Sequence, residues 1–434
     1  MMNLLGSVEL ALVDCLRLTA DPIPSHHLET LHLQEWSLLV DLAMAQHVAP
    51  LVFHCLKQAG FQSRVPDHQW HRLQAAHSNN AKKNLIVMAQ TLKIAGLLQD
   101  NHISVIILKG NHLANTVYEN RALRIMGDLD ILVPDHQASH AAELVRTMGY
   151  QPLKEYIGQP EDTLCQSCHL CRMQKKGWID LEIHVTIALP TMQTTFSVDD
   201  LWRRAVPQQM GQRMVLVLST EDLLLHLCEH TSLQHCFDFG LRPFCDLVQV
   251  IAHHGSSINW SAICERAIFW GWEKGVCLAL EIAHDLLGAA VPAWVLRTLQ
   301  PDPVDITILR VAVTQLLCNQ QSLPPMSANM AQLWDEKTLW GKLRRFWQTV
   351  FLPDNIMATK YPIHSFPGVR YMYYGVRAID VLRRYWQTAY GLFRSDTDLT
   401  SLSARQNMLA CWLQPEKVTI QNVEYSKRKM KLKC

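Results

Sequence analysis

The sequence lacks any run of about 18 uncharged apolar residues, the length that a membrane-spanning helix needs, so no membrane span is expected. It also lacks an excess of either charge, because 40 basic and 39 acidic residues give a formal net charge of +1. This balance gives no overall reason to expect a nucleic-acid or membrane surface. Internal repeats and long low-complexity segments are absent too, which argues against a repeat protein.

No secretory signal is expected from the first residues of the sequence. The first residues are apolar and amphipathic, but no basic region opens them, and Glu9 and Asp14 interrupt them. The chain has 13 cysteines, an odd number, scattered through apolar segments. We therefore expect a reducing cytoplasm in which the thiols stay free.

What the sequence contains is enough apolar material for a sizeable core. Its 434 residues are 49% hydrophobic, which allows two or three domains. We expect an α+β fold: a small mixed β-sheet core at 101–206, flanked by helical regions at 1–100 and 207–395. A polar basic tail at 396–434 is expected to be flexible.

The most informative stretch runs from 106 to 133. An apolar run at 105–108 predicts a buried strand, Lys109-Gly110 ends it, and Asn111 is expected to cap the helix that follows. A second strand then opens with Asp128 and Asp130. Residues two apart on a strand share a face, so these carboxylates project together. Paired carboxylates repel each other, so one explanation for this pair is that a cation binds between them. The other explanation is an ordinary Asp-rich turn that leads into the strand.

A third acid is available in the stretch 178–185, which alternates between apolar and polar residues. As a strand it places Asp180, Glu182 and His184 on one face. Next to the aspartate pair, this face would complete a three-carboxylate site, whereas alone it would be an ordinary half-exposed strand.

Together these motifs resemble a bacterial family of uncharacterised nucleotidyltransferases in the DNA polymerase β-like superfamily. The resemblance runs from about residue 35 to 390. The matching motifs, in chain order, are Leu108-Lys109-Gly110, Tyr118, Arg124, Asp128-Leu129-Asp130 and Glu182-Ile183-His184. Two positions depart from the pattern: Lys109-Gly110 replaces the Gly-Ser turn of the wider superfamily, and Val185 replaces an aromatic residue.

The resemblance implies transfer of a nucleoside monophosphate from an NTP, which we expect to be ATP, to an unidentified small-molecule or peptide acceptor. It implies Mg²⁺ or Mn²⁺ held by Asp128, Asp130 and Glu182, with Asp180 as an alternative third acid. Nucleic acid is not favoured as a partner. A non-catalytic nucleotide-binding scaffold is the competing hypothesis.

The remaining candidates concern the nucleotide. Lys109, the backbone amides after Gly110, and His184 are expected to bind it. Arg124 is expected to pair either with phosphate or with Asp128. Second-rank candidates from the helical region are His226, His230 and Asp246. The spacing of Cys165, Cys168 and Cys171 is compatible with a zinc or iron–sulfur site, although a set of buried thiols is the preferred interpretation.

Overall fold

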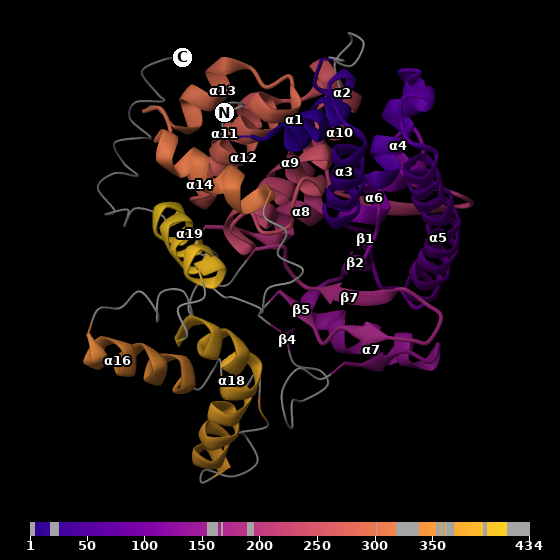
Figure 1. Ribbon diagram of the computed structural model, residues 1–434. Helices are drawn as coiled ribbons and strands as arrows, with labels where there is room; N and C mark the ends of the chain where they lie inside the picture. Colours follow the sequence, from indigo (N-terminus) through magenta and orange to yellow (C-terminus); the bar gives the residue numbers. More distant parts are fainter. Residues whose placement is uncertain are drawn as a thin grey trace, which may run out of the picture.

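The computed structural model describes residues 5–17, 26–153, 164–165, 168–188, 195–300, 302–317, 338–352, 357, 361, 369–393 and 397–414. It confirms the predicted α+β class, with one mixed sheet surrounded by helices (Figure 1). None of the described helices combines the length and the apolar character needed to cross a bilayer. The basic residues at 426–434 lie outside the described residues.

Helices precede the sheet, as predicted. They are α1 (Ser7–Leu16), α2 (His26–Glu29), α3 (Leu33–Ala45), α4 (Ala49–Gln58), the 3-10 helix η2 (Phe61–Ser63) and α5 (Asp67–Asp100). Pro50 lies in the first turn of α4, where its missing amide hydrogen costs no hydrogen bond. The spacing of Leu85, Met88 and Leu92 in the sequence predicts the last of these helices only from Ala81. Helix α5 begins 14 positions earlier because no Gly or Pro interrupts 67–80 and because Trp70 and Leu73 are buried against its neighbours.

The sheet is built from short strands. They are β1 (Ile106–Ile107), β2 (Asp128–Leu132), β3 (Gln151–Pro152), β4 (Leu164–Cys165), β5 (His169–Leu170), β6 (Met173–Gln174), β7 (Asp180–His184), β8 (Val206–Met210) and β9 (Arg213–Val217). Their order is β3-β6-β7-β2-β1-β9-β8, and β5 joins β4 to β7. Strand β2 is parallel to β7 and antiparallel to β1. The β8–β9 hairpin, which the sequence did not predict, adds β9 parallel to β1, so the sheet continues past residue 206.

Helices connect these strands. They are α6 (Lys109–Thr116), the 3-10 helices η3 (Arg121–Leu123) and η4 (Asp135–Gln137), α7 (Ala138–Thr147) and α8 (Val198–Arg204). Asn111 was predicted to cap α6, but the helix already begins at Lys109, and Asn111 lies inside it. Its side-chain amide instead donates a hydrogen bond to the Thr91 hydroxyl of α5. This buried polar contact explains why a residue with cap propensity sits within the first turn.

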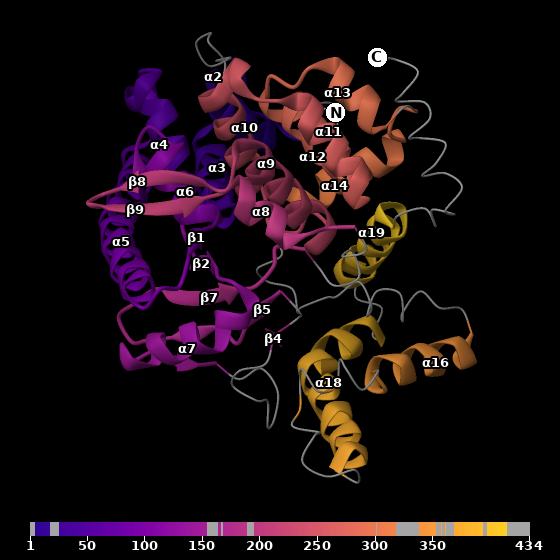
Figure 2. The same ribbon diagram turned by 180° about the vertical axis from the view of Figure 1, so that it is seen from behind.

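The helical region after the sheet begins at Ser219, whose hydroxyl accepts a hydrogen bond from the Asp222 amide, as is typical of an N-cap. The elements are α9 (Thr220–Glu229), the π-helix η6 (His230–Gln234), α10 (Arg242–His254), the 3-10 helix η7 (Gly255–Ser257), α11 (Trp260–Trp270), α12 (Glu273–Leu287), α13 (Ala293–Leu299) and α14 (Ile306–Leu317). Beyond them lie α16 (Leu339–Val350), α18 (Val369–Phe393) and α19 (Thr397–Leu413). Helix α19 lies between α14 and α18, and α16 and α18 extend away from the sheet (Figure 2).

Two hydrophobic clusters hold these layers together. One joins helices from before and after the sheet, so that Leu12 of α1, Leu39 of α3 and Leu280 of α12 belong to the same buried cluster. The other lies against the sheet and contains Leu129 of β2 and Leu181 of β7. The apolar alternate residues of β2 and β7 therefore face a core, which leaves their polar alternate residues to share the other face.

Candidate active site

The register between β2 and β7 brings the sequence-predicted acids together. In this parallel pair Asp128 is opposite Asp180, Asp130 is opposite Glu182, and Leu132 is opposite His184. Period-two alternation then places the acidic side chains on one face of the two neighbouring strands. The sequence left the choice between Asp180 and Glu182 open, and the structure pairs Glu182 with the more deeply buried aspartate, Asp130.

Asp130, Glu182 and His184 form a tight cluster in which one ligand atom from each lies within 4.8 Å of the others. The Nε2 atom of His184 lies 2.9 Å from Oδ1 of Asp130 and 3.5 Å from Oε2 of Glu182. Burial lowers the pKa of His184, but its hydrogen bonds to Asp130, Cys168 and Glu182 raise it well above the usual value. The imidazole thus hydrogen-bonds Asp130 and lies within ion-pair distance of Glu182.

Asp128 lies beside this cluster but is more exposed. Its side chain is 36% exposed, and its Oδ2 lies 3.6 Å from Nη2 of Arg172. Burial raises the pKa of Asp128, and the negative charges of Asp130 and Glu182 raise it further. Mutual repulsion among these acids is the condition that a bound cation would relieve.

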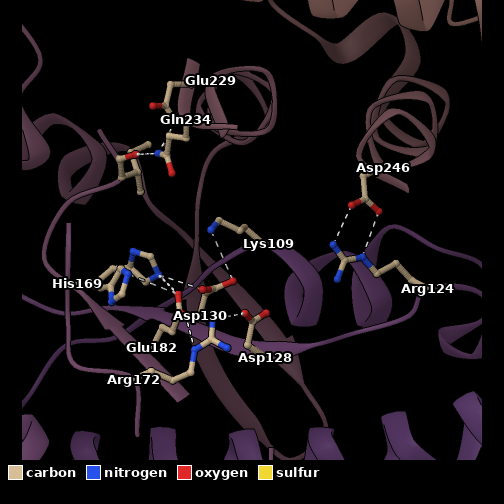
Figure 3. Close-up of polar contacts among 12 residues, drawn as sticks. Lys109, Arg124, Asp128, Asp130, His169, Arg172, Glu182, Glu229, Gln234 and Asp246 are labelled. Atoms are coloured by element: carbon tan, nitrogen blue, oxygen red, sulfur yellow. Dashed lines mark hydrogen bonds and ion pairs between the residues drawn. The ribbon is translucent and has the colours of Figure 1, made fainter. Parts of the chain in front are cut away.

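Lys109 supplies a positive charge to the cluster. Its Nζ atom lies 3.7 Å from Oδ2 of Asp130, at the start of α6 (Figure 3). Burial would raise the pKa of Asp130, but Lys109 and His184 lower it below its usual range. The backbone of Lys109 has φ of 36°, a conformation that non-glycine residues seldom adopt, and this strain occurs at the point where β1 turns into α6.

Arg172, which the sequence analysis missed, bridges the acids from the turn between β5 and β6 (Figure 3). Its Nε donates to Oε1 of Glu182 at 2.9 Å, and its guanidinium also lies within 4.0 Å of Asp128 and Asp180. Burial and the Asp130 charge raise the pKa of Glu182, but the hydrogen bond to His184 and the nearby His169 lower it to about 2. Glu182 is therefore ionised at neutral pH, and Arg172 compensates its charge.

Arg124 does not pair with Asp128, which was one of its two predicted roles. Its guanidinium instead makes two hydrogen bonds to Asp246 of α10, with Nε–Oδ1 of 3.2 Å and Nη2–Oδ2 of 2.8 Å. The Tyr118 hydroxyl donates to the same carboxylate at 2.8 Å. All three residues are buried. The Arg124–Asp246 contact (Figure 3) joins the end of η3 to α10, and the Tyr118 hydroxyl joins the end of α6 to the same carboxylate. Gly110 makes room for it, because a Cβ there would lie 2.1 Å from Nη1 of Arg124.

Helix α5 fixes the loop that leads into β2. The Asn80 and Asn84 amides donate to backbone carbonyls of this loop, including that of Arg124 at 3.1 and 2.8 Å. The Lys83 ammonium donates to the Met126 carbonyl at 2.6 Å. Helix α5 therefore positions the segment from which Asp128 emerges.

The two second-rank histidines have different positions. His230 lines the cavity described below, whereas His226 is fully buried, and neither of its ring nitrogens has a hydrogen-bond partner among the described residues. Burial and the Lys109 charge lower the pKa of both imidazoles well below the usual value. The ring centroids are 6.1 Å apart. His226 does not belong to the cluster of potential metal ligands that the described residues form.

Glu229, next to η6, is a buried carboxyl whose Oε2 accepts a hydrogen bond from the Gln234 amide at 2.7 Å. Burial raises its pKa from 4.5 to about 8. Between these values the folded state keeps a proton that the unfolded state has lost, so stability falls as pH rises from about 4.5 to 8. The Glu229→Gln side chain cannot titrate. We therefore expect the free energy of unfolding of this variant to exceed that of wild type by an amount that grows as the pH rises from about 4.5 to 8, up to about 4 kcal/mol.

Urea unfolding of wild type and Glu229→Gln at pH 5, 6.5 and 8 measures this difference. The variant should lose less stability than wild type as the pH rises. Parallel pH profiles for the two proteins would contradict a protonated Glu229 in the folded state.

The carboxylates of β2 and β7, together with Lys109 and Arg172, line one cavity of ≈ 290 Å³, close to the lower limit of about 300 Å³ for small-ligand pockets. Its lining includes every primary site residue that the sequence predicted: Lys109, Gly110, Arg124, Asp128, Asp130, Glu182 and His184. Of the second-rank candidates, His230 and Asp246 line it. The lining residues that the sequence analysis missed include His169, Arg172, Gln234, His235, Phe239 and Arg242.

These missed residues come from two short stretches, 169–172 and 234–242, in which no local pattern points to a binding site. Arg242 begins α10, and within the described part of the chain its guanidinium donates one long hydrogen bond, of 3.4 Å, to the Ile125 carbonyl. The Nε atom of Arg242 is buried and has no partner among the described residues. Arg242 therefore joins Lys109, Arg124 and Arg172 as a fourth basic side chain in the cavity wall.

The predicted cysteine cluster is only partly described. Cys168 and Cys171 are buried, and the side chain of Cys165 lies outside the described residues. Within the described part of the chain the cysteines form no disulfide.

The donor set is suited to a hard divalent cation, because carboxylate oxygens are the ligands that Mg²⁺ and Mn²⁺ prefer. Asp128, Asp130 and Glu182 supply such oxygens within one cavity. A comparison with protein families matches residues 32–288 to the family described as uncharacterised nucleotidyltransferase, starting where the sequence resemblance was placed and ending at 288 rather than near 390. Searches of curated proteins and of solved structures found no match. The matched segment is more than half of the chain and contains the whole carboxylate cluster, and the protein belongs to the uncharacterised nucleotidyltransferase family.

Proposed function

We propose that the protein transfers a nucleoside monophosphate from an NTP, with ATP as the first candidate, to a hydroxyl or phosphate of an acceptor. The observation that carries this proposal is the register of β2 and β7, which aligns Asp130 with Glu182 in a cavity that also contains Lys109. Membership of a nucleotidyltransferase family supports the same reaction class.

In this proposal Asp128, Asp130 and Glu182 hold Mg²⁺ or Mn²⁺, as in the DNA polymerase β-like enzymes that the motifs resemble. When bound, the ion activates the attacking oxygen and neutralises charge on the leaving pyrophosphate. Lys109 and Arg242 bind phosphate oxygens, since both cations line the cavity. His184 orients the carboxylates through its contacts with Asp130 and Glu182. Arg124 and Asp246 keep α10 against the site rather than contacting the reacting groups.

A specific observation also favours the non-catalytic alternative, a nucleotide-binding scaffold. Arg172, Lys109 and His184 already compensate the acids, so the site is electrostatically balanced by its own side chains. In the transfer proposal a bound cation would compete with Arg172 for the Glu182 carboxylate, whereas a scaffold involves no such competition.

Calorimetric titration of ATP and GTP in the presence of Mg²⁺ distinguishes the two. For the proposed enzyme we expect metal-dependent binding that the double variant Asp128→Asn/Asp130→Asn loses, by at least about a hundredfold, while it remains folded. Asp135→Asn is the matched control, because this exposed acid follows β2 outside the cavity. Binding that persists without Mg²⁺ and in the double variant would favour the scaffold. Loss of binding in the Asp135→Asn control would show that the effect is not specific to the site.

A further inference from the structure

Three rings form one contiguous surface in the cavity, and we call the set of His230, His235 and Phe239 the aromatic wall. The ring centroids of His235 and Phe239 are 4.0 Å apart, and those of His230 and His235 are 4.6 Å apart. His230 and Phe239 stack with an interplanar angle of 17°. All three residues line the same cavity as the carboxylates.

The aromatic wall is uncharged at neutral pH. Burial and the Lys109 charge lower the pKa of His235 to about 3, and the same two causes lower that of His230 well below its usual value. The cations and acids in the cavity are contributed by other residues, among them Lys109, Arg242 and Asp130. The cavity thus combines an uncharged aromatic region with a strongly charged one.

The backbone holds Phe239 in this position. Cys236 and Phe237 have φ of 45° and 64°, a left-handed conformation that two successive non-glycine residues rarely adopt. The Phe237 amide donates to the Thr231 carbonyl at 2.8 Å, and the Phe237 side chain is fully buried against Phe244. This anchoring leaves Phe239, a large apolar residue, 39% exposed. Strain of this kind persists only where the surrounding structure determines it.

Gly240 closes the segment. Its φ is 71°, and a Cβ there would lie 2.2 Å from Oε1 of Gln46. That same oxygen accepts a hydrogen bond from the Leu241 amide at 2.8 Å. The loop that contains Phe239 therefore contacts the end of α3 and leads directly into α10. These two connections hold the position of Phe239.

We propose that the aromatic wall is the platform on which the nucleobase of the NTP stacks, with Phe239 as its principal residue. The inference rests on the proposed function and extends it by assigning the base. A nucleotide joins an uncharged aromatic base to a polyanion, which matches the two regions of the cavity. Stacking on an aromatic side chain tolerates any base, since every base presents a π-face.

The test compares two ligands that differ in the base. Mg²⁺-ATP and Mg²⁺-tripolyphosphate are titrated calorimetrically into the full-length wild type, Phe239→Ala and Phe239→Trp. We expect Phe239→Ala to weaken ATP binding about tenfold or more and to change tripolyphosphate affinity by less than about twofold. Phe239→Trp, which keeps a stacking surface, should retain ATP affinity.

Phe269→Ala is the matched control, because Phe269 is an exposed phenylalanine on α11 outside the cavity. It should leave both affinities unchanged. Equal weakening of the two ligands in Phe239→Ala, or no weakening of either, would overturn the platform while leaving the phosphate and metal site in place. If wild type binds neither ligand, the proposed function fails, and the platform fails with it.

Discussion

Glu182→Gln is expected to abolish nucleotidyl transfer, whereas Asp180→Asn is expected to lower it by no more than about tenfold. Both acids lie on the same face of β7, two positions apart, but only Glu182 is opposite Asp130. Removing a carboxylate that holds a divalent ion removes several kcal/mol of transition-state stabilisation. About 4 kcal/mol corresponds to about a thousandfold in rate.

Asp180 has a different environment. Its side chain is 30% exposed, it accepts a hydrogen bond from Gln174 at 3.0 Å, and it is not among the residues that line the cavity. A loss of its charge therefore changes the field at Arg172 but leaves the Asp130–Glu182 pair intact. The two variants are well matched, since each replaces one acid of the same strand by its amide.

The measurement is pyrophosphate release from ATP in the presence of Mg²⁺, with a cell lysate as the source of acceptors. Circular dichroism and thermal unfolding establish that both variants fold. Equal activity of Glu182→Gln and wild type would exclude Glu182 as an essential ligand, and a larger loss in Asp180→Asn than in Glu182→Gln would assign the third carboxylate to Asp180.

These two variants test a choice that the sequence left open, namely whether Asp180 or Glu182 is the third carboxylate. The period of two along a strand is local information, so it predicted that Asp128 and Asp130 share a face and that Glu182 and His184 do too. The register of β2 against β7 is not local, because their pairing spans about fifty residues of intervening chain. The sequence therefore specified the candidate acids but did not decide between Asp180 and Glu182.

The same distinction explains what was missed. Arg172 reaches the acids from a turn between two-residue strands, and no propensity or spacing marks it. The β8–β9 hairpin was missed because Pro207 and two glutamines make β8 a poor strand by composition, although its pairing with β9 is continuous. Asn111 was assigned as a helix cap from its propensity, and a buried contact with Thr91 placed it inside the helix instead.

The second large effect concerns stability. Asp246→Ala is expected to lower the free energy of unfolding by about 3–5 kcal/mol, because it leaves the Arg124 guanidinium buried without its carboxylate. Asp246 is 2% exposed and Arg124 is 8% exposed, so water cannot easily replace the lost partner. Tyr118→Phe removes one hydrogen bond to the same carboxylate and should cost about 1 kcal/mol.

Urea unfolding at one pH compares these variants with Arg124→Met/Asp246→Leu, which removes both charges at once. A buried pair replaced by apolar side chains often costs less than a pair with one member removed, so the double variant should be more stable than Asp246→Ala. A loss of less than about 1 kcal/mol in the free energy of unfolding of Asp246→Ala would show that the Arg124–Asp246 pair contributes little to stability.

The double variant also decides what Arg124 does. The sequence left Arg124 between phosphate and Asp128, and its two hydrogen bonds to Asp246 indicate a third role, which is to hold η3 and α6 against α10. If that role is its main one, the folded Arg124→Met/Asp246→Leu protein should bind Mg²⁺-tripolyphosphate within about threefold of wild type, since Lys109 and Arg242 remain. A loss of about tenfold or more would instead make Arg124 a phosphate ligand, because charge-assisted hydrogen bonds to phosphate are worth this much. Unfolding and tripolyphosphate binding of the same double variant therefore distinguish a structural role of Arg124 from a role in binding phosphate.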